Sequence, residues 1–82
     1  MEIREVLARN LRKLRQAQGL SQEELAFASD LHRTYISGVE RGVRNPTVVI
    51  VARIAAALDV EPDSVLRHAD AATGKTDQMT GK

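Results

Sequence analysis

The chain has 82 residues, with 12 Lys or Arg against 11 Asp or Glu, and it contains no cysteine. This length suits one small domain, and the lack of cysteine excludes disulfides and thiolate metal sites and is typical of a cytoplasmic protein. No apolar run is long enough for a membrane span or a signal peptide, so no membrane partner is expected. With one Tyr, one Phe and no Trp, the chain also lacks the aromatic platform of a single-strand nucleic-acid binder.

The charges are unevenly distributed along the chain. The net charge of +1 is too small for nucleic-acid binding by bulk electrostatics alone. Basic residues gather over residues 4–15 and 33–44, whereas acidic residues gather after residue 58. Judged by charge pattern alone, a solvated mixture of charges and a basic binding face fit equally well.

A first helix is predicted over residues 3–18, where apolar residues recur at helical spacing. Gly19 should end this helix, with Leu20 folding back in a Schellman arrangement. The side chains expected to face the core are Ile3, Leu7, Leu11 and Leu14.

Residues 21–41 predict a helix-turn-helix. Ser21 and Glu24 form a capping box, in which each side chain accepts the backbone N–H of the other residue, and this box starts a helix. A short polar stretch then breaks the helix, and Leu31 should tuck between the two helices. The second helix is expected over residues 33–41, where glycine follows its last residue.

Two more helices are predicted in the second half of the chain. One should begin after its cap residue Thr47 and end near Asp59. The β-branched run over residues 48–51 read alone suggests a strand, but helical spacing continues across it. A shorter helix should follow over residues 62–67, with proline at its first position. The side chains of both helices expected on the core are Val48, Val51, Ile54, Ala55, Leu58, Val65 and Leu66.

The predicted fold class is therefore all-α. Residues 1–68 should form a compact five-helix bundle that contains the helix-turn-helix. The remaining residues 69–82 are small, polar and aperiodic, and we expect a disordered tail there.

At this point the chain resembles the helix-turn-helix regulators related to the lambdoid phage repressors and Cro. Within that family, the stretch RTYISGVERGVRNPT over residues 33–47 is similar to the controller proteins of restriction-modification systems. The resemblance covers roughly residues 8–66 and implies a lambda-repressor-like DNA-binding domain in a transcription regulator. The matching residues are Gln22, Ala26, Ile36, Val39, Glu40, Arg41, Gly42, Pro46 and Thr47.

The chain departs from the family pattern at two positions. Asp30 stands where the family often has glycine, but Asp is among the few residues tolerated at positive φ. His32 stands where a Ser, Thr or Asp cap is usual, so the second helix of the motif should be weakly capped.

Arg33 is the leading candidate for reading a base. It lies at the start of a helix, where the macrodipole disfavours a cation by roughly 0.3 to 1 kcal/mol. Two unfavourable choices at one helix end, His32 and Arg33, suggest selection for something other than stability. An arginine there can make a bidentate contact to guanine, and the alternative is a phosphate contact alone. The other candidates are Thr34 and Ser37 as base readers and Gln22, Tyr35, Arg44 and Asn45 as DNA backbone contacts. Groove contacts are open for Tyr35 and Ser37, and minor-groove contacts for Arg44 and Asn45. Tyr35 could equally pack on the surface of the bundle.

The resemblance further implies an ion pair between Arg15 and Glu40, which would join the first helix to the end of the third. Val49 and Ile50 are left pointing away from the predicted core. We expect them to form, with Val65, a homodimer interface that sets two recognition helices one DNA turn, ~34 Å, apart. The alternative is a set of scattered surface hydrophobes.

No catalytic constellation accompanies these features. The two histidines are far apart and no cysteine or carboxylate cluster joins them, so neither a metal nor a cofactor is expected. No enzyme activity and no small-molecule ligand are expected either. The sequence favours a bacterial or phage-encoded regulator that binds a pseudo-palindromic double-stranded DNA operator as a homodimer. The alternatives are an antitoxin-type module that neutralises a partner protein, and a helical bundle that only shares the fold.

Overall fold

The computed structural model describes residues 2–67, which fold into five α-helices, and the predicted all-α class is confirmed. The sequence-predicted tail over residues 69–82 lies outside the described residues. None of the five described helices has the length and apolar character needed to cross a membrane. The helices are α1 (Ile3–Ala17), α2 (Gln22–Ser29), α3 (Arg33–Glu40), α4 (Val48–Ala57) and α5 (Pro62–Leu66).

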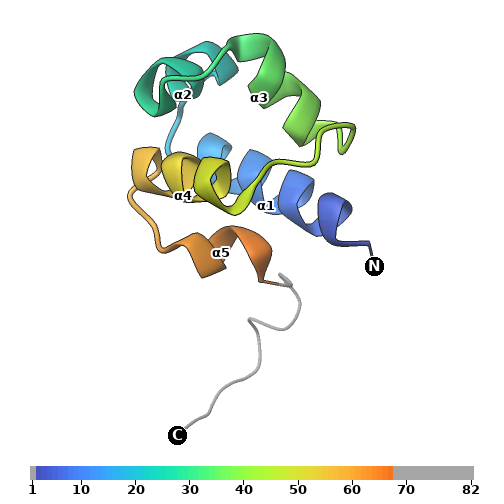
Figure 1. Ribbon diagram of the computed structural model, residues 1–82. Coiled ribbons are helices and arrows are strands. Elements are labelled where there is room, and N and C mark those ends of the chain that lie inside the picture. Colours follow the sequence, from blue (N-terminus) through green and yellow to red (C-terminus); the bar gives the residue numbers. More distant parts are fainter. Residues whose placement is uncertain (1, 68–82) are drawn as a thin grey trace, which may run out of the picture.

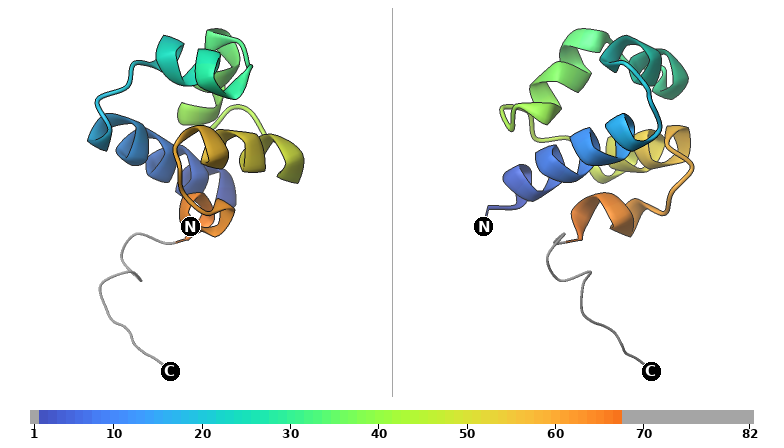
Figure 2. Two further views of the ribbon diagram at one scale, coloured as in Figure 1. Left: turned by 90° about the vertical axis from the view of Figure 1, so that its left-hand side faces the viewer. Right: turned by 180° about the vertical axis from the view of Figure 1, so that it is seen from behind.

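The helices pack in a compact arrangement with α2 and α3 together on one side. Figure 1 shows this pair above α1 and α4, with α5 on the opposite side, and the two views in Figure 2 agree. α1 packs against α3 and α5, and α4 packs against α2 and α5. The helix-turn-helix therefore rests on a base made by the other three helices, which leaves its outer side free.

Local capping starts and ends the helices as the sequence predicts. Ser21 Oγ accepts the backbone N–H of Glu24 at 2.9 Å, and Glu24 Oε1 accepts that of Ser21 at 2.8 Å, so the capping box is confirmed. At the end of α1, Gly19 has φ +70° and the N–H of Leu20 donates to the carbonyl of Arg15 at 3.1 Å, as in a Schellman motif. These contacts direct the chain from α1 into α2.

The turn between α2 and α3 is closed by Asp30 and Leu31. Asp30 adopts φ +58°, the left-handed conformation that its side chain tolerates. The N–H of Leu31 then donates to the carbonyl of Ala26 at 2.8 Å, and its half-buried side chain packs on the core. Arg53 of α4 donates to the carbonyl oxygens of both Ser29 and Asp30, at 3.0 and 2.7 Å, so it fastens the turn to the base of the bundle.

The core contains most of the predicted side chains but not those at helix ends. Ile3 is 54% exposed and Val48 is 84% exposed, although both were predicted to face inward. Each lies in the first turn of its helix, and because helical side chains tilt toward the N-terminus, they project past the end of the core. Leu66, the last residue of α5, is 42% exposed, which also corrects the prediction.

The predicted dimer interface is wrong at Val65 and in part at Ile50. Val65 is fully buried, so its side chain cannot reach a partner. Ile50 is half-buried and packs against the core. Val49 alone of the three is exposed as predicted, at 67%. The apolar surface of the monomer must therefore be sought around other residues.

The short helix α5 is joined to α1 by a buried polar side chain that the sequence analysis did not single out. Asn10 is 6% exposed, and its Nδ2 donates to the carbonyl oxygens of Val65 and Arg67. These bonds satisfy carbonyl groups at the C-terminal end of a five-residue helix, where the helix itself offers no partner. Asn10 therefore holds the end of α5 in place.

Candidate nucleic-acid interface

The N-terminal end of α3 is exposed on the helix-turn-helix. Arg33 and Thr34 begin the helix with exposed side chains. His32 occupies the cap position but its side chain makes no capping hydrogen bond, and the first turn carries no acidic residue. A cationic side chain thus projects from a weakly capped helix end, as the sequence predicts, and this geometry suits insertion into the major groove.

A second cationic side chain lies beside the C-terminal half of α3. The guanidinium Cζ of Arg44 is 5.6 Å from the centroid of the Tyr35 ring, within the range of a cation–π contact. Tyr35 is half-buried and packs against the core, so its ring is held in place. The structure therefore brings together Tyr35 and Arg44, two of the predicted DNA contacts. Asn45 follows Arg44 in the loop and is exposed.

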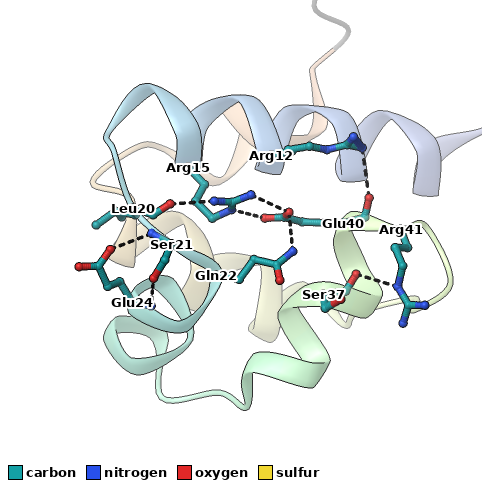
Figure 3. Close-up of polar contacts among 9 residues, drawn as sticks. All are labelled: Arg12, Arg15, Leu20, Ser21, Gln22, Glu24, Ser37, Glu40 and Arg41. Carbon is teal, nitrogen blue, oxygen red and sulfur yellow. Dashed lines mark hydrogen bonds and ion pairs between the residues drawn. The ribbon is translucent and has the colours of Figure 1, made fainter.

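A buried ion pair links α1 to the end of α3. Arg15 Nε donates to Glu40 Oε2 at 2.6 Å and Arg15 Nη2 donates to Glu40 Oε1 at 3.1 Å (Figure 3). Glu40 is 5% exposed, and the side chain of Arg15 is 11% exposed. The hydrogen bond from Arg15 to Glu40 raises the pKa of the guanidinium, against the opposing effect of burial. The two hydrogen bonds of the pair therefore hold the C-terminal end of α3 against α1.

Two further side chains converge on Glu40. Arg12 Nη2 donates to its backbone carbonyl at 3.2 Å, and Gln22 Nε2 donates to its Oε1 at 3.0 Å (Figure 3). The side chain of Gln22, predicted to contact the DNA backbone, is thus held within the protein by one of its two N–H groups. Its other N–H group and the N-terminal end of α2 remain the parts that suit a phosphate.

The family model for "Helix-turn-helix" proteins matches residues 11–65, which include α2, α3 and every residue of the Glu40 network. This match covers more than half of the chain. The chain belongs to this helix-turn-helix family. Among proteins of similar sequence is the control protein C.SmaI of Serratia marcescens, 47% identical over 66 residues that span 80% of this chain and 79% of that protein. Control protein C.BamHI of Bacillus amyloliquefaciens is 45% identical over 65 residues, 78% of this chain and 80% of that protein.

Solved structures of controller proteins share the fold. The restriction-modification controller protein C.AhdI from Aeromonas hydrophila has a TM-score of 0.74 and 50% identity, and the match covers 76% of this chain and 94% of that one. A second match is the controller protein C.Esp1396I, crystallised as a tetramer with its natural 35 base-pair operator. That match has a TM-score of 0.71 and 32% identity, and it covers 82% of this chain and 99% of that one.

The sequence analysis did not single out three residues that make structural contacts: Arg12 and Gly38 beside this surface, and Asn10 at the end of α5. Arg12 and Asn10 act through contacts with residues far along the chain, for which a sequence pattern gives no signal. Gly38 is different, because an isolated glycine inside a helical pattern is itself a signal of close packing. Its carbonyl accepts the N–H groups of both Val43 and Arg44, at 3.0 and 3.3 Å, so the loop folds back onto it.

Proposed function

We propose that this protein is a transcriptional regulator that binds a pseudo-palindromic DNA operator as a homodimer in the bacterial cytoplasm. The observation that carries the proposal is the exposed Arg33 at the open end of α3, in a helix-turn-helix whose other side is fastened to the bundle. The related proteins described above are control proteins, and one of them was crystallised with its operator. They favour this function over the antitoxin alternative.

In this proposal α3 enters the major groove and reads bases with its exposed N-terminal residues. Arg33 supplies a bidentate contact to guanine O6 and N7, and the Thr34 methyl and hydroxyl groups suit a neighbouring thymine or acceptor. Ser37 lies one turn later in α3 and would be a third residue that reads a base. Its side chain is half-buried, so it extends less far from the helix. The side chains proposed to grip the DNA backbone are Gln22, Tyr35, Arg44 and Asn45.

Two copies would dimerise through an apolar surface that differs from the one predicted from sequence. Exposed Ile3, Val48 and Leu66 surround one apolar hollow between the start of α1, the start of α4 and α5. Val49, also exposed, lies next to Val48 on α4. Contiguous apolar surface of this kind is uncommon on a monomer and is the expected signature of a self-complementary contact. This surface keeps Val49 from the interface first expected and takes the place of Ile50 and Val65.

The proposed function is tested by a gel shift on the DNA upstream of the gene that encodes the protein. A labelled fragment should be retained at protein concentrations at which a fragment of unrelated sequence and equal length is not. The midpoint should be measured at several salt concentrations. Phosphate contacts make the logarithm of the binding constant fall linearly with the logarithm of the salt concentration. Equal retention of both fragments would refute sequence-specific binding.

The dimer surface is tested by sedimentation of two matched variants. Val48→Glu and Phe27→Glu each place one negative charge on an exposed apolar residue, 84% and 88% exposed respectively. Only Val48 borders the apolar hollow, whereas Phe27 lies on α2. Val48→Glu should sediment as a monomer and Phe27→Glu as a dimer. A Val48→Glu protein that remains dimeric would remove this surface from the interface.

A further inference from the structure

The backbone conformation at Gly38 in α3 does not require glycine. It lies inside the helix and is buried, and it is not among the described residues with positive φ. Glycine in a helix interior is less favourable than alanine, because it loses more conformational freedom on folding. Its presence is therefore better explained by something that needs the space a side chain would fill.

Arg44 is what fills that space. A Cβ atom added to Gly38 would lie 2.6 Å from Arg44 Cγ, 3.3 Å from its Nε and 3.5 Å from its Cδ. The first distance is far below van der Waals contact, so any side chain at residue 38 would push the arginine stem away. The backbone N–H of Arg44 also donates to the carbonyl of Gly38. The arginine is thus joined to Gly38 by its backbone and packed against Gly38 by its stem.

The other end of the same side chain rests on Tyr35. The guanidinium is 5.6 Å from the ring centroid, and the ring is backed by the core. Gly38 and Tyr35 are three positions apart and so lie on one face of α3. Together they hold the Arg44 side chain along α3, because Gly38 leaves room for its aliphatic stem and the Tyr35 ring contacts its guanidinium. An arginine held in this way loses much less rotamer freedom on binding a ligand than a freely rotating arginine does.

We propose that Gly38 is a positioning residue that directs Arg44 along α3 onto Tyr35, so that its guanidinium is oriented before DNA arrives. This inference rests on the proposed function only for its last step, the contact of Arg44 with DNA. The placement of Arg44 by Gly38 is a property of the free protein. The two parts can therefore be tested separately.

The placement is tested without DNA by NMR spectroscopy. Tyr35 is the only tyrosine and the chain has no tryptophan. Ring-current shifts of the Arg44 side-chain protons that disappear in Tyr35→Leu therefore report on this one stacking contact. The shifts should be present in the native protein and in Tyr35→Phe, which keeps the ring. They should be lost in Tyr35→Leu and in Gly38→Ala. The urea midpoint of Gly38→Ala should be unchanged or higher, because the exposed Arg44 can turn away and alanine favours the helix. Unchanged Arg44 shifts in Gly38→Ala would overturn the proposal.

The consequence for DNA binding is tested by a double-mutant cycle. Arg44→Ala should weaken operator binding roughly 10-fold or more, as for the loss of a charge-assisted hydrogen bond. Gly38→Ala should weaken it by part or all of that factor, and by nothing further when added to Arg44→Ala. An equal loss in both backgrounds would overturn the positioning role, because Gly38 would then act independently of Arg44. If Arg44→Ala binds normally while Gly38→Ala loses the NMR shifts, the placement stands and the assignment of Arg44 to DNA is wrong.

Discussion

Removal of the Glu40 carboxylate should be the most damaging single change in the polar network. Glu40 is 5% exposed and accepts two hydrogen bonds from Arg15 and one from Gln22. Glu40→Ala would leave Arg15 with the carbonyl of Leu20, 2.7 Å from its Nη1, and with no opposite charge. A buried charge left without its partner costs about 3 to 5 kcal/mol. Because small domains have only about 5 to 15 kcal/mol of stability, Glu40→Ala should lose a large fraction of it.

The exposed ion pair between Asp63 of α5 and Arg67, the residue that follows this helix, is a control. Arg67 Nη2 lies 2.6 Å from Asp63 Oδ2, the same distance as in the shortest contact between Arg15 and Glu40, but the two side chains are 54% and 68% exposed. Asp63→Ala should therefore cost less than about 1 kcal/mol. The two pairs differ in burial and in the number of hydrogen bonds that each carboxylate accepts.

The free energies of unfolding are to be measured by urea melts followed by circular dichroism. One protein concentration should be used throughout, because the stability of a dimer depends on concentration. The double variant Arg15→Met with Glu40→Leu should lose less than Glu40→Ala alone, since no charge is then left buried. A loss below about 1 kcal/mol for Glu40→Ala, or one equal to that of Asp63→Ala, would refute the reasoning.

The pH dependence has a definite sign. The pKa of Arg15 is raised in the folded protein, chiefly by its hydrogen bond to Glu40. A raised pKa stabilises the fold fully below the ordinary arginine pKa, and this contribution is lost only as pH rises through the raised value. The contribution of Arg15 should thus stay constant from neutral to mildly alkaline pH.

Three other substitutions test separate parts of the structure. Arg33→Ala should leave the fold intact or slightly more stable and weaken operator binding by about 1 to 3 kcal/mol, with relaxed preference at one G·C pair per half-site. Binding to operators that carry each base at every half-site position checks this, and an unchanged base preference would refute it. Asn10→Ala should cost about 1 to 3 kcal/mol in urea melts, because two carbonyl groups at the end of α5 lose their donor. Ser21→Ala should cost about 1 kcal/mol through the lost cap of α2, and a change within error would mean that the capping box is not stabilising.

The sequence by itself determined where the helices begin and, to within two residues, where they end. The capping box at Ser21, the Schellman turn at Gly19 and the left-handed Asp30 were all predicted and are all present. Each depends on residues within about five positions of one another, so the chain carries its own information about them. The helical spacing likewise identified most of the core, including Leu7 and Ile54.

Only the tertiary structure decided how far the core extends and which side chains meet across it. Helical spacing places Val48 on the same face of its helix as Val51. It does not tell whether another helix covers that face at its N-terminal end. The ion pair of Arg15 and Glu40 was implied by the family resemblance, whereas the bond from Asn10 to Val65, 55 positions away, had no such guide. The packing of Arg44 on Gly38 could not be predicted from the sequence either, because it depends on how the loop after α3 folds back. Such contacts are set by the packing of whole helices, and no short stretch of sequence contains that information.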